Sequence, residues 1–213
     1  NFYGSWEGGY QRLTEFQLAN GTDGLVVAGS TGEAPTLTAR ERLSVIEYVA
    51  GIDDGRVPLI AGVGSSDTRV ACELALAAER AGADGLLVST PAYNRPQQRG
   101  LEQHFGAVAS VSTLPVVLYN IPSRTGVDLL PATVRSIARA HGNVVAIKEA
   151  GTSIERVQQL IALDVVDVLA GEDAWIVDAI HLGACGVIGV VANVIPATVA
   201  ELVRGLQAGD TAE

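Results

Sequence analysis

Two patterns of apolar and polar residues alternate along this chain. Short apolar runs with almost no polar interruption are typical of strands buried on both faces of a sheet. Between them lie longer segments with the mixed apolar and polar spacing of helices. The repeat is about 25 to 30 residues, which matches β/α units joined by short loops. The expected strands cover residues 24–30, 57–63, 85–90, 115–120, 144–150, 166–171 and 186–190.

The helical segments carry recognisable start signals. Residues 7–20 form a plausible helix before the first strand. Thr38 and Glu41 have the spacing of a capping box, and Asp67 can cap a helix that runs to about Ala81. A helix follows each later strand, and strands this apolar need such cover on both sides. The pattern therefore predicts a parallel sheet.

Seven β/α units after a leading helix suggest an eight-stranded (β/α)8 TIM barrel that lacks its first strand. The alternative is an open doubly wound sheet, which commonly binds dinucleotides through a Gly-x-Gly-x-x-Gly turn. Only the first part of that motif occurs, at residues 62–67, so the barrel is favoured. We expect one barrel domain over residues 1–213. Because the chain contains no Met, even at position 1, we also expect that it is not the complete gene product.

Composition narrows the class of protein. Acidic residues number 24 and basic residues 14, so nucleic acid is not an expected partner. No run of 18 or more apolar residues occurs, and no signal peptide precedes the fold. Cys72 and Cys185 each lie in an apolar context, far apart in the sequence. We expect both to be reduced core residues of a cytoplasmic protein with no membrane contact.

The one lysine in the sequence, Lys148, directly follows the apolar run Val144–Ile147. Burying an ammonium group without a partner costs several kcal/mol, and loss of the proton relieves that penalty. A lysine with a lowered pKa is a nucleophile toward carbonyl carbon. The alternative is a strand-end lysine whose amine extends to water.

Polar residues gather at the carboxyl ends of the expected strands, which converge on one site in a barrel. An enzyme that forms a Schiff base needs a neutral amine, a proton shuttle and, for a keto acid, an anion clamp. Lys148, Tyr119, the Gly29–Gly32 turn and Arg124 can supply these groups.

Each of these residues also has an ordinary structural interpretation. Tyr119 can be a core aromatic, Tyr93 a surface aromatic and Arg124 a solvated loop charge. Ser30 and Glu33 can form a capping box. The three histidines are scattered, and no His, Cys or carboxylate cluster has the spacing of a metal site.

Three motifs resemble the dihydrodipicolinate synthase and N-acetylneuraminate lyase family of class I aldolases. They are Gly-Ser-Thr-Gly-Glu at 29–33, Tyr-Asn-Ile-Pro-Ser-Arg-Thr-Gly at 119–126 and Ile-Lys-Glu-Ala at 147–150. The resemblance runs from about Gly21 to Val203, in the order and spacing of the motifs as well as in their residues. The family begins with a further strand and ends with further helices, so the resemblance implies that the first strand and the C-terminal helices are missing from this chain.

The resemblance implies that Lys148 forms an imine with pyruvate and that no other cofactor or metal is needed. Tyr119 would relay protons, and Thr31 would connect it to Tyr93. In the family that last tyrosine reaches in from a neighbouring subunit, so a homodimer, commonly within a homotetramer, would be required for activity.

The resemblance also assigns the substrate pocket. Arg124 would hold the carboxylate of an aldehyde co-substrate, and Gly171 and Ile188 would shape the pocket around the imine. Ser30 stands where the synthases usually carry Thr, and its hydroxyl can make the same hydrogen bond. The position of Ala92 belongs to the family's lysine-feedback site, whose usual ligands are missing here, so the resemblance implies weak or absent inhibition by lysine.

The arginine in the second motif favours the branch that condenses pyruvate with aspartate semialdehyde on the way to lysine. A keto-deoxy sugar acid aldolase or dehydratase, or an enzyme like the sialic acid lyases, remains an alternative. A non-catalytic keto-acid-binding protein is a second one.

Overall fold

The computed structural model describes residues 6–151 and 153–209. In this part of the chain seven parallel strands pair in sequence order, β1 to β7. The strands are β1 Leu25–Val27, β2 Leu59–Gly62, β3 Gly85–Ser89, β4 Val116–Asn120, β5 Val144–Glu149, β6 Asp167–Ala170 and β7 Gly186–Val187. The α-helices are α1 Trp6–Ala19, α2 Ala39–Asp53, α3 Thr68–Arg80, α4 Gln98–Val111, α5 Pro122–Thr125, α6 Pro131–Ala140, α7 Ile154–Ile161, α8 Ile176–His181 and α9 Pro196–Ala208. Short 3-10 helices are η1 Ala34–Thr36, η2 Asp173–Trp175 and η3 Val191–Asn193.

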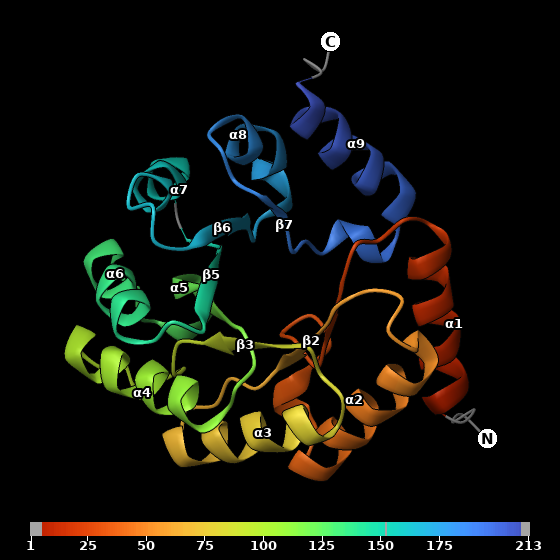
Figure 1. The fold of residues 1–213 in the computed structure, drawn as a ribbon, viewed down its shortest axis with the longest axis horizontal. Helices are drawn as coiled ribbons and strands as arrows, with labels where there is room; N and C mark the ends of the chain where they lie inside the picture. The colour runs from red at the N-terminus through yellow and green to blue at the C-terminus, as the bar shows by residue number, and fades with distance from the viewer. Residues whose placement is uncertain (1–5, 152, 210–213) are drawn as a thin grey trace.

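The sheet curls on itself and the helices lie around its outer face (Figure 1). A doubly wound sheet would reverse its strand order at a switch point, and the sequential order found here excludes that alternative. Among the described residues β1 pairs only with β2, and β7 only with β6. The sheet is therefore an open barrel with its two edges on either side of a gap.

The ends of the described chain are tied across this gap. Gln17 of α1 donates a hydrogen bond from Nε2 to the Ala192 carbonyl, at 2.8 Å. Arg204 of α9 donates from Nη2 to the Gly21 carbonyl at 2.6 Å and to Asp23 Oδ1 at 2.9 Å. These bonds join α1 to η3 and α9 to the loop that follows α1, which brings the two ends of the described chain close together at the right of Figure 1.

The predicted helix starts are confirmed. Thr38 accepts from the Glu41 amide, and Glu41 accepts in return from the Thr38 amide, so α2 begins with a complete capping box. Asp67 accepts from two amides in the first turn of α3. Each cap fixes the point at which a loop enters its helix, and with it the length of the preceding strand end.

Alternation along the strands separates two apolar layers. Val116, Leu118 and Ile147 face the helices in the main core. Val117 and Ala146 face the interior of the barrel. A side chain's direction is therefore set by its position in the strand.

Two expectations about burial are wrong. Val145 was expected inside a run buried on both faces, but β5 bulges there. Val116 pairs with Val144 and Val117 with Ala146, which leaves Val145 unpaired and exposed. Cys185 was expected in the core, but it is exposed beside the edge strand β7, while Cys72 is half-buried.

No α-helix within residues 6–151 and 153–209 is both long and apolar enough to cross a membrane.

Candidate active site

Lys148 lies at the carboxyl end of β5 and points into the barrel. In the parallel register it pairs with Tyr119 of β4 on one side and with Leu169 of β6 on the other. Paired residues of neighbouring strands share a face, and Tyr119 belongs to the apolar layer inside the barrel. The register therefore brings the amine and the phenol together in one layer at the end of the barrel.

Both side chains are almost fully buried. Lys148 is 6% exposed and Tyr119 is 4% exposed. The amine nitrogen Nζ lies 4.4 Å from the centroid of the Tyr119 ring. The alternative in which the lysine extends to water is therefore wrong, because the strand holds the amine inside the barrel.

Burial lowers the pKa of Lys148 to about 8, from 10.5. The carboxylates of Glu172 and Asp173, which follow β6, oppose this shift, and the charge of Arg124 adds to it. At pH 7.5 a pKa of about 8 leaves roughly a quarter of the amine neutral, against about one part in a thousand at the ordinary value. The site thus supplies a nucleophilic amine near neutral pH.

Burial also raises the pKa of Tyr119, and the Glu172 charge acts in the same direction. Arg124 and a hydrogen bond from the Ser30 side chain lower it. The phenol stays protonated near neutral pH and can both donate and accept a proton beside the amine.

The turn after β1 presents Ser30 toward Tyr119. Both residues line a cavity of about 70 Å³. Ala28 has a φ of 54° and ends the strand, which turns the following residues over the barrel mouth. Thr31 lies in the same turn and, like Ser30, is exposed, but it is not among the residues that line this cavity. The hydroxyl that the structure places against Tyr119 is therefore that of Ser30, rather than that of Thr31 as expected from the sequence.

The capping-box interpretation of Ser30 and Glu33 is wrong. Glu33 itself is the N-cap of η1, in the left-handed region at φ 55°, and its side chain makes no capping hydrogen bond. The Glu33 amide instead donates to the Ser30 carbonyl, at 3.1 Å. The Ser30 hydroxyl therefore takes no part in a helix cap.

Tyr93 lies on the surface of the chain. Its side chain is 93% exposed. Its φ of 71° is uncommon for a bulky residue, and its amide donates to the Thr125 carbonyl at 3.1 Å. The backbone around Tyr93 is thus held in place, while the ring is left on the surface.

Arg124 lies in the one-turn helix α5 that follows β4, and it is exposed. Its neighbour Thr125 is buried and accepts a hydrogen bond from the Thr90 hydroxyl of the β3 end, at 2.9 Å. The Arg124 charge lowers the pKa of both Lys148 and Tyr119.

Gly171 permits the close approach of two strand ends. A Cβ at this position would lie 2.7 Å from the Ala150 Cβ and 2.8 Å from the Glu149 carbonyl oxygen. The Gly171 amide donates to that same carbonyl, at 2.8 Å. The residue therefore shapes the floor beside Lys148 through the backbone.

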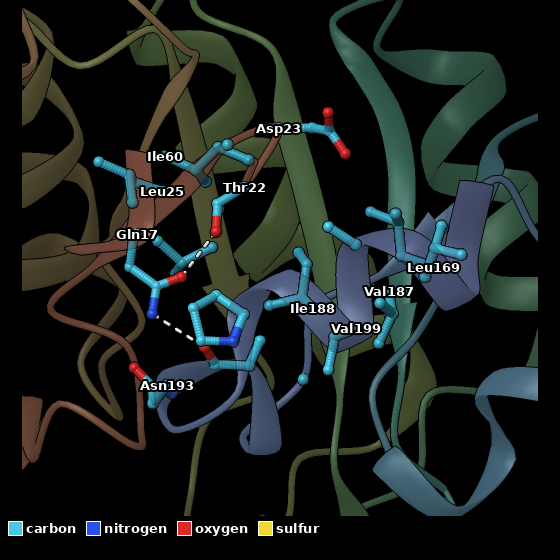
Figure 2. Close-up of a pocket in the computed structure, with 18 of the residues that line it drawn as sticks. Gln17, Thr22, Asp23, Leu25, Ile60, Leu169, Val187, Ile188, Asn193 and Val199 are labelled. Atoms are coloured by element: carbon cyan, nitrogen blue, oxygen red, sulfur yellow. Dashed lines mark hydrogen bonds between the residues drawn. The ribbon is translucent and has the colours of Figure 1, made fainter. Parts of the chain in front are cut away.

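Ile188 lies in a different place from the other expected site residues. It follows β7 and lines a cavity of about 360 Å³ between β7 and β1, shown in Figure 2 with Val187, Leu169 and Ile60. Lys148 and Tyr119 are not among the residues that line this cavity. Asp173 anchors the adjoining loop by accepting from the Val190 amide, at 3.0 Å.

A buried polar network lies behind the site and was not predicted from the sequence. Glu149 and Asn120 directly follow Lys148 and Tyr119 and face the opposite side of the sheet, where Glu149 is 0% exposed. Burial raises the pKa of Glu149 to about 7, although its hydrogen bond from Asn120 and the charge of Arg156 oppose this shift. Strand alternation could have indicated that this pair faces away from the barrel interior.

Comparisons with known proteins agree with the geometry. A family profile described as the dihydrodipicolinate synthetase family matches residues 7–213. The 4-hydroxy-tetrahydrodipicolinate synthase of Geobacter metallireducens is 48% identical over 202 residues, which cover 94% of this chain and 69% of that protein.

Solved structures of the same family superpose closely on this chain. A crystal structure of dihydrodipicolinate synthase from Aquifex aeolicus has a TM-score of 0.94 at 41% identity, covering 96% of this chain and 70% of that one. A structure described as the first monomeric dihydrodipicolinate synthase variant has a TM-score of 0.92 at 39% identity, covering 95% of this chain and 69% of that one. The expected (β/α)8 barrel class and the family resemblance are confirmed, and the chain belongs to the dihydrodipicolinate synthetase family.

Proposed function

We propose that this chain is a lyase that condenses pyruvate with aspartate semialdehyde through an imine on Lys148, the reaction for which its relatives are named. The observation that carries the proposal is the buried amine at the carboxyl end of β5, with a pKa of about 8 and a phenol in the same layer. The neutral amine attacks the keto carbon of pyruvate, and the carbinolamine loses water to give the imine. The lysine imine takes the place of a metal or separate cofactor.

Tyr119 is the proton shuttle of these steps. Its hydroxyl donates the proton that departs with water and accepts one from the methyl carbon of the imine, which gives an enamine. The enamine carbon attacks the aldehyde of the second substrate. The amine of that substrate then displaces Lys148 as the ring closes, and this displacement regenerates the free enzyme.

Ser30, rather than Thr31, is the next hydroxyl of the relay, because it is the one that acts on the Tyr119 phenol. Tyr93 would complete the relay in the site of a neighbouring copy, since its ring is exposed and available to a second chain. A homodimer, or a homotetramer built from it, is the assembly that this arrangement favours.

Arg124 binds the carboxylate of aspartate semialdehyde at the mouth of the site, where an exposed guanidinium can form a two-pronged hydrogen bond. Gly171 shapes the pocket beside the imine, whereas Ile188 lines the neighbouring cavity between β7 and β1. A cytoplasmic location suits a biosynthetic reaction of small, charged metabolites.

The test is reduction with borohydride in the presence of pyruvate, read by intact mass. Since Lys148 is the one lysine in the sequence, peptide mapping assigns the adduct without ambiguity. We expect one pyruvate adduct on Lys148, none in Lys148→Met, and none when pyruvate is omitted. No adduct in the folded wild-type chain would remove the Schiff-base proposal.

The second substrate is tested separately. With the adduct established, turnover with aspartate semialdehyde is compared with turnover of a neutral keto-deoxy sugar acid. Arg124→Ala should cripple the first reaction and change the second far less. Preference of the wild-type chain for the sugar acid would assign it to the alternative branch.

A further inference from the structure

Two consecutive residue pairs of β4 and β5 face opposite sides of the barrel wall. Tyr119 pairs with Lys148 inside, and one position later Asn120 pairs with Glu149. Asn120 and Glu149 are both 0% exposed. The carboxyl group has no part in the proposed chemistry, and a buried, titratable group of this kind requires a reason.

The Asn120 amide is the centre of the network. Its Nδ2 donates to both carboxylate oxygens of Glu149, at 3.0 and 3.1 Å, and to Asp128 Oδ1 at 2.9 Å. Its Oδ1 accepts from the Leu129 amide, at 3.0 Å. Because the Leu129 amide can only donate, it fixes the Asn120 side chain with oxygen toward Leu129 and nitrogen toward the two carboxyl groups.

Helix α7 holds the far end of the loop of residues 121–129, which begins directly after Asn120. Arg156 binds Asp128 with both Nη atoms, at 3.0 Å to Oδ1 and 2.7 Å to Oδ2. Arg156 Nη1 also donates to the Leu129 carbonyl, at 3.1 Å. The loop of residues 121–129 thus starts beside Asn120 and ends on residues that Asn120 and Arg156 clamp together.

Arg124 lies within this loop. The loop is also held at Thr125, which accepts from the Thr90 hydroxyl and the Tyr93 amide, and at the Asp128 carbonyl, which accepts from Gln98 Nε2 at 2.7 Å. A shift of Asp128 or Leu129 therefore moves the helix α5 that carries the guanidinium. Misplacing a group that orients substrate by about 1 Å can reduce rates by about a hundredfold.

The glycine after the strand shows how closely the network is fitted. A Cβ at Gly151 would collide with the Glu149 carboxylate oxygen Oε1. The Gly151 amide also hydrogen-bonds to this carboxylate. Glu149 is thus held in one position from both the strand and the following turn.

We infer that Glu149 is a positioning residue for Arg124, which acts through Asn120 and Asp128 to fix the loop that binds the carboxylate of the second substrate. This inference rests on the proposed function. It assigns Glu149 to the recognition of the aldehyde substrate and not to the formation of the imine.

The test combines Glu149→Gln with Arg124→Ala in a double-mutant cycle. Glutamine keeps the shape of Glu149 but replaces one acceptor oxygen with an NH2 donor. This donor faces the Asn120 amide nitrogen, which is itself a donor, so one hydrogen bond is lost. We expect KM for aspartate semialdehyde to rise about tenfold, with kcat within about twofold and an unchanged yield of the pyruvate adduct. In the Arg124→Ala background, Glu149→Gln should change KM by less than about twofold, because the two residues act as one unit.

The matched control is Glu155→Gln, the same change at an exposed position beside Arg156, and it should leave KM unaltered. Asp128→Asn breaks the other arm of the clamp and should reproduce the rise in KM. It decides the question if Glu149→Gln does not fold, as judged by circular dichroism. An unchanged KM, or effects of Glu149→Gln and Arg124→Ala that multiply independently, would overturn the inference. Absence of the pyruvate adduct in the wild-type chain would instead overturn the proposed function.

Discussion

Replacing Lys148 with methionine is expected to stabilise the folded chain at neutral pH while it abolishes imine formation. The pKa of this amine falls from 10.5 to about 8 because folding removes it from water. Below pH 8 the folded chain therefore holds an ammonium group that is more stable in the unfolded chain. Methionine has a similar unbranched shape, carries no charge and suits the apolar interior.

The size of the effect follows from the shift in pKa. A difference of about 2.5 units corresponds to about 3.4 kcal/mol at 1.36 kcal/mol per unit. Between pH 8 and 10.5 the unfolded state binds more protons than the folded state, so wild-type stability rises with pH across this window. The advantage of Lys148→Met should therefore be about 3 kcal/mol at pH 7 and about 0.4 kcal/mol at pH 10.5.

The assay is urea unfolding of both proteins at pH 7, 9 and 10.5, compared as the difference in free energy of unfolding at each pH. Any change in packing from the methionine adds a constant to that difference, so its dependence on pH isolates the buried charge. Arg99→Met removes an exposed positive charge and should show no such trend. A difference that is the same at pH 7 and 10.5 would refute the reasoning, because burial would then not depress the pKa of Lys148.

Three further perturbations test separate parts of the structure. Tyr119→Phe keeps the ring but removes the hydroxyl, so kcat should fall by about 10² to 10⁴ with little change in melting temperature; a decrease below tenfold would exclude Tyr119 from proton transfer. Gly171→Ala places a Cβ 2.7 Å from the Ala150 Cβ and 2.8 Å from the Glu149 oxygen, and urea unfolding should show a loss of about 2 kcal/mol, whereas unaltered stability would contradict the close approach. Burial lowers the pKa of His104 to about 4 from 6.5, so its contribution to stability is complete above pH 6.5 and is lost as pH falls through 4. His104→Gln should therefore lose about 3 kcal/mol less than the wild-type chain on acidification across this window, and equal losses would count against a buried, neutral imidazole.

The repeating pattern was sufficient to predict the barrel, because parallel strands covered on both faces are apolar throughout. It was less informative about where each strand ends. The first strand was expected over 24–30 but stops at Val27, since Ala28 enters the left-handed region. The expected strand over 186–190 is two residues long, because the Asp173 carboxylate holds the following amides in a loop. Such ends depend on tertiary contacts that a local pattern does not contain.

The candidate site was predictable where strand alternation decides direction, and less so in the turns. Lys148 and Tyr119 were expected together because both end apolar strands, and they are. Neighbouring hydroxyls in a turn have no such periodicity, and the structure presents Ser30 to the phenol where Thr31 was expected. The clamp on the Arg124 loop joins Asp128 to Arg156, 28 positions apart, and no local signal links that pair.

The register between β4 and β5 links the chemistry to its support. Residues that share a register position share a face, so a slip of one residue in either strand would exchange faces and place Glu149 beside Tyr119. The Lys148 amine would then lie on the opposite face of the sheet from the phenol, and the two groups would no longer act together. The bulge at Val145 lies upstream in the same pair of strands, and because Val145 is unpaired, Val144 and Ala146 stay paired with the consecutive residues Val116 and Val117. The nucleophile and the clamp on the substrate-binding loop are therefore set by one register, so both should be lost together when it changes.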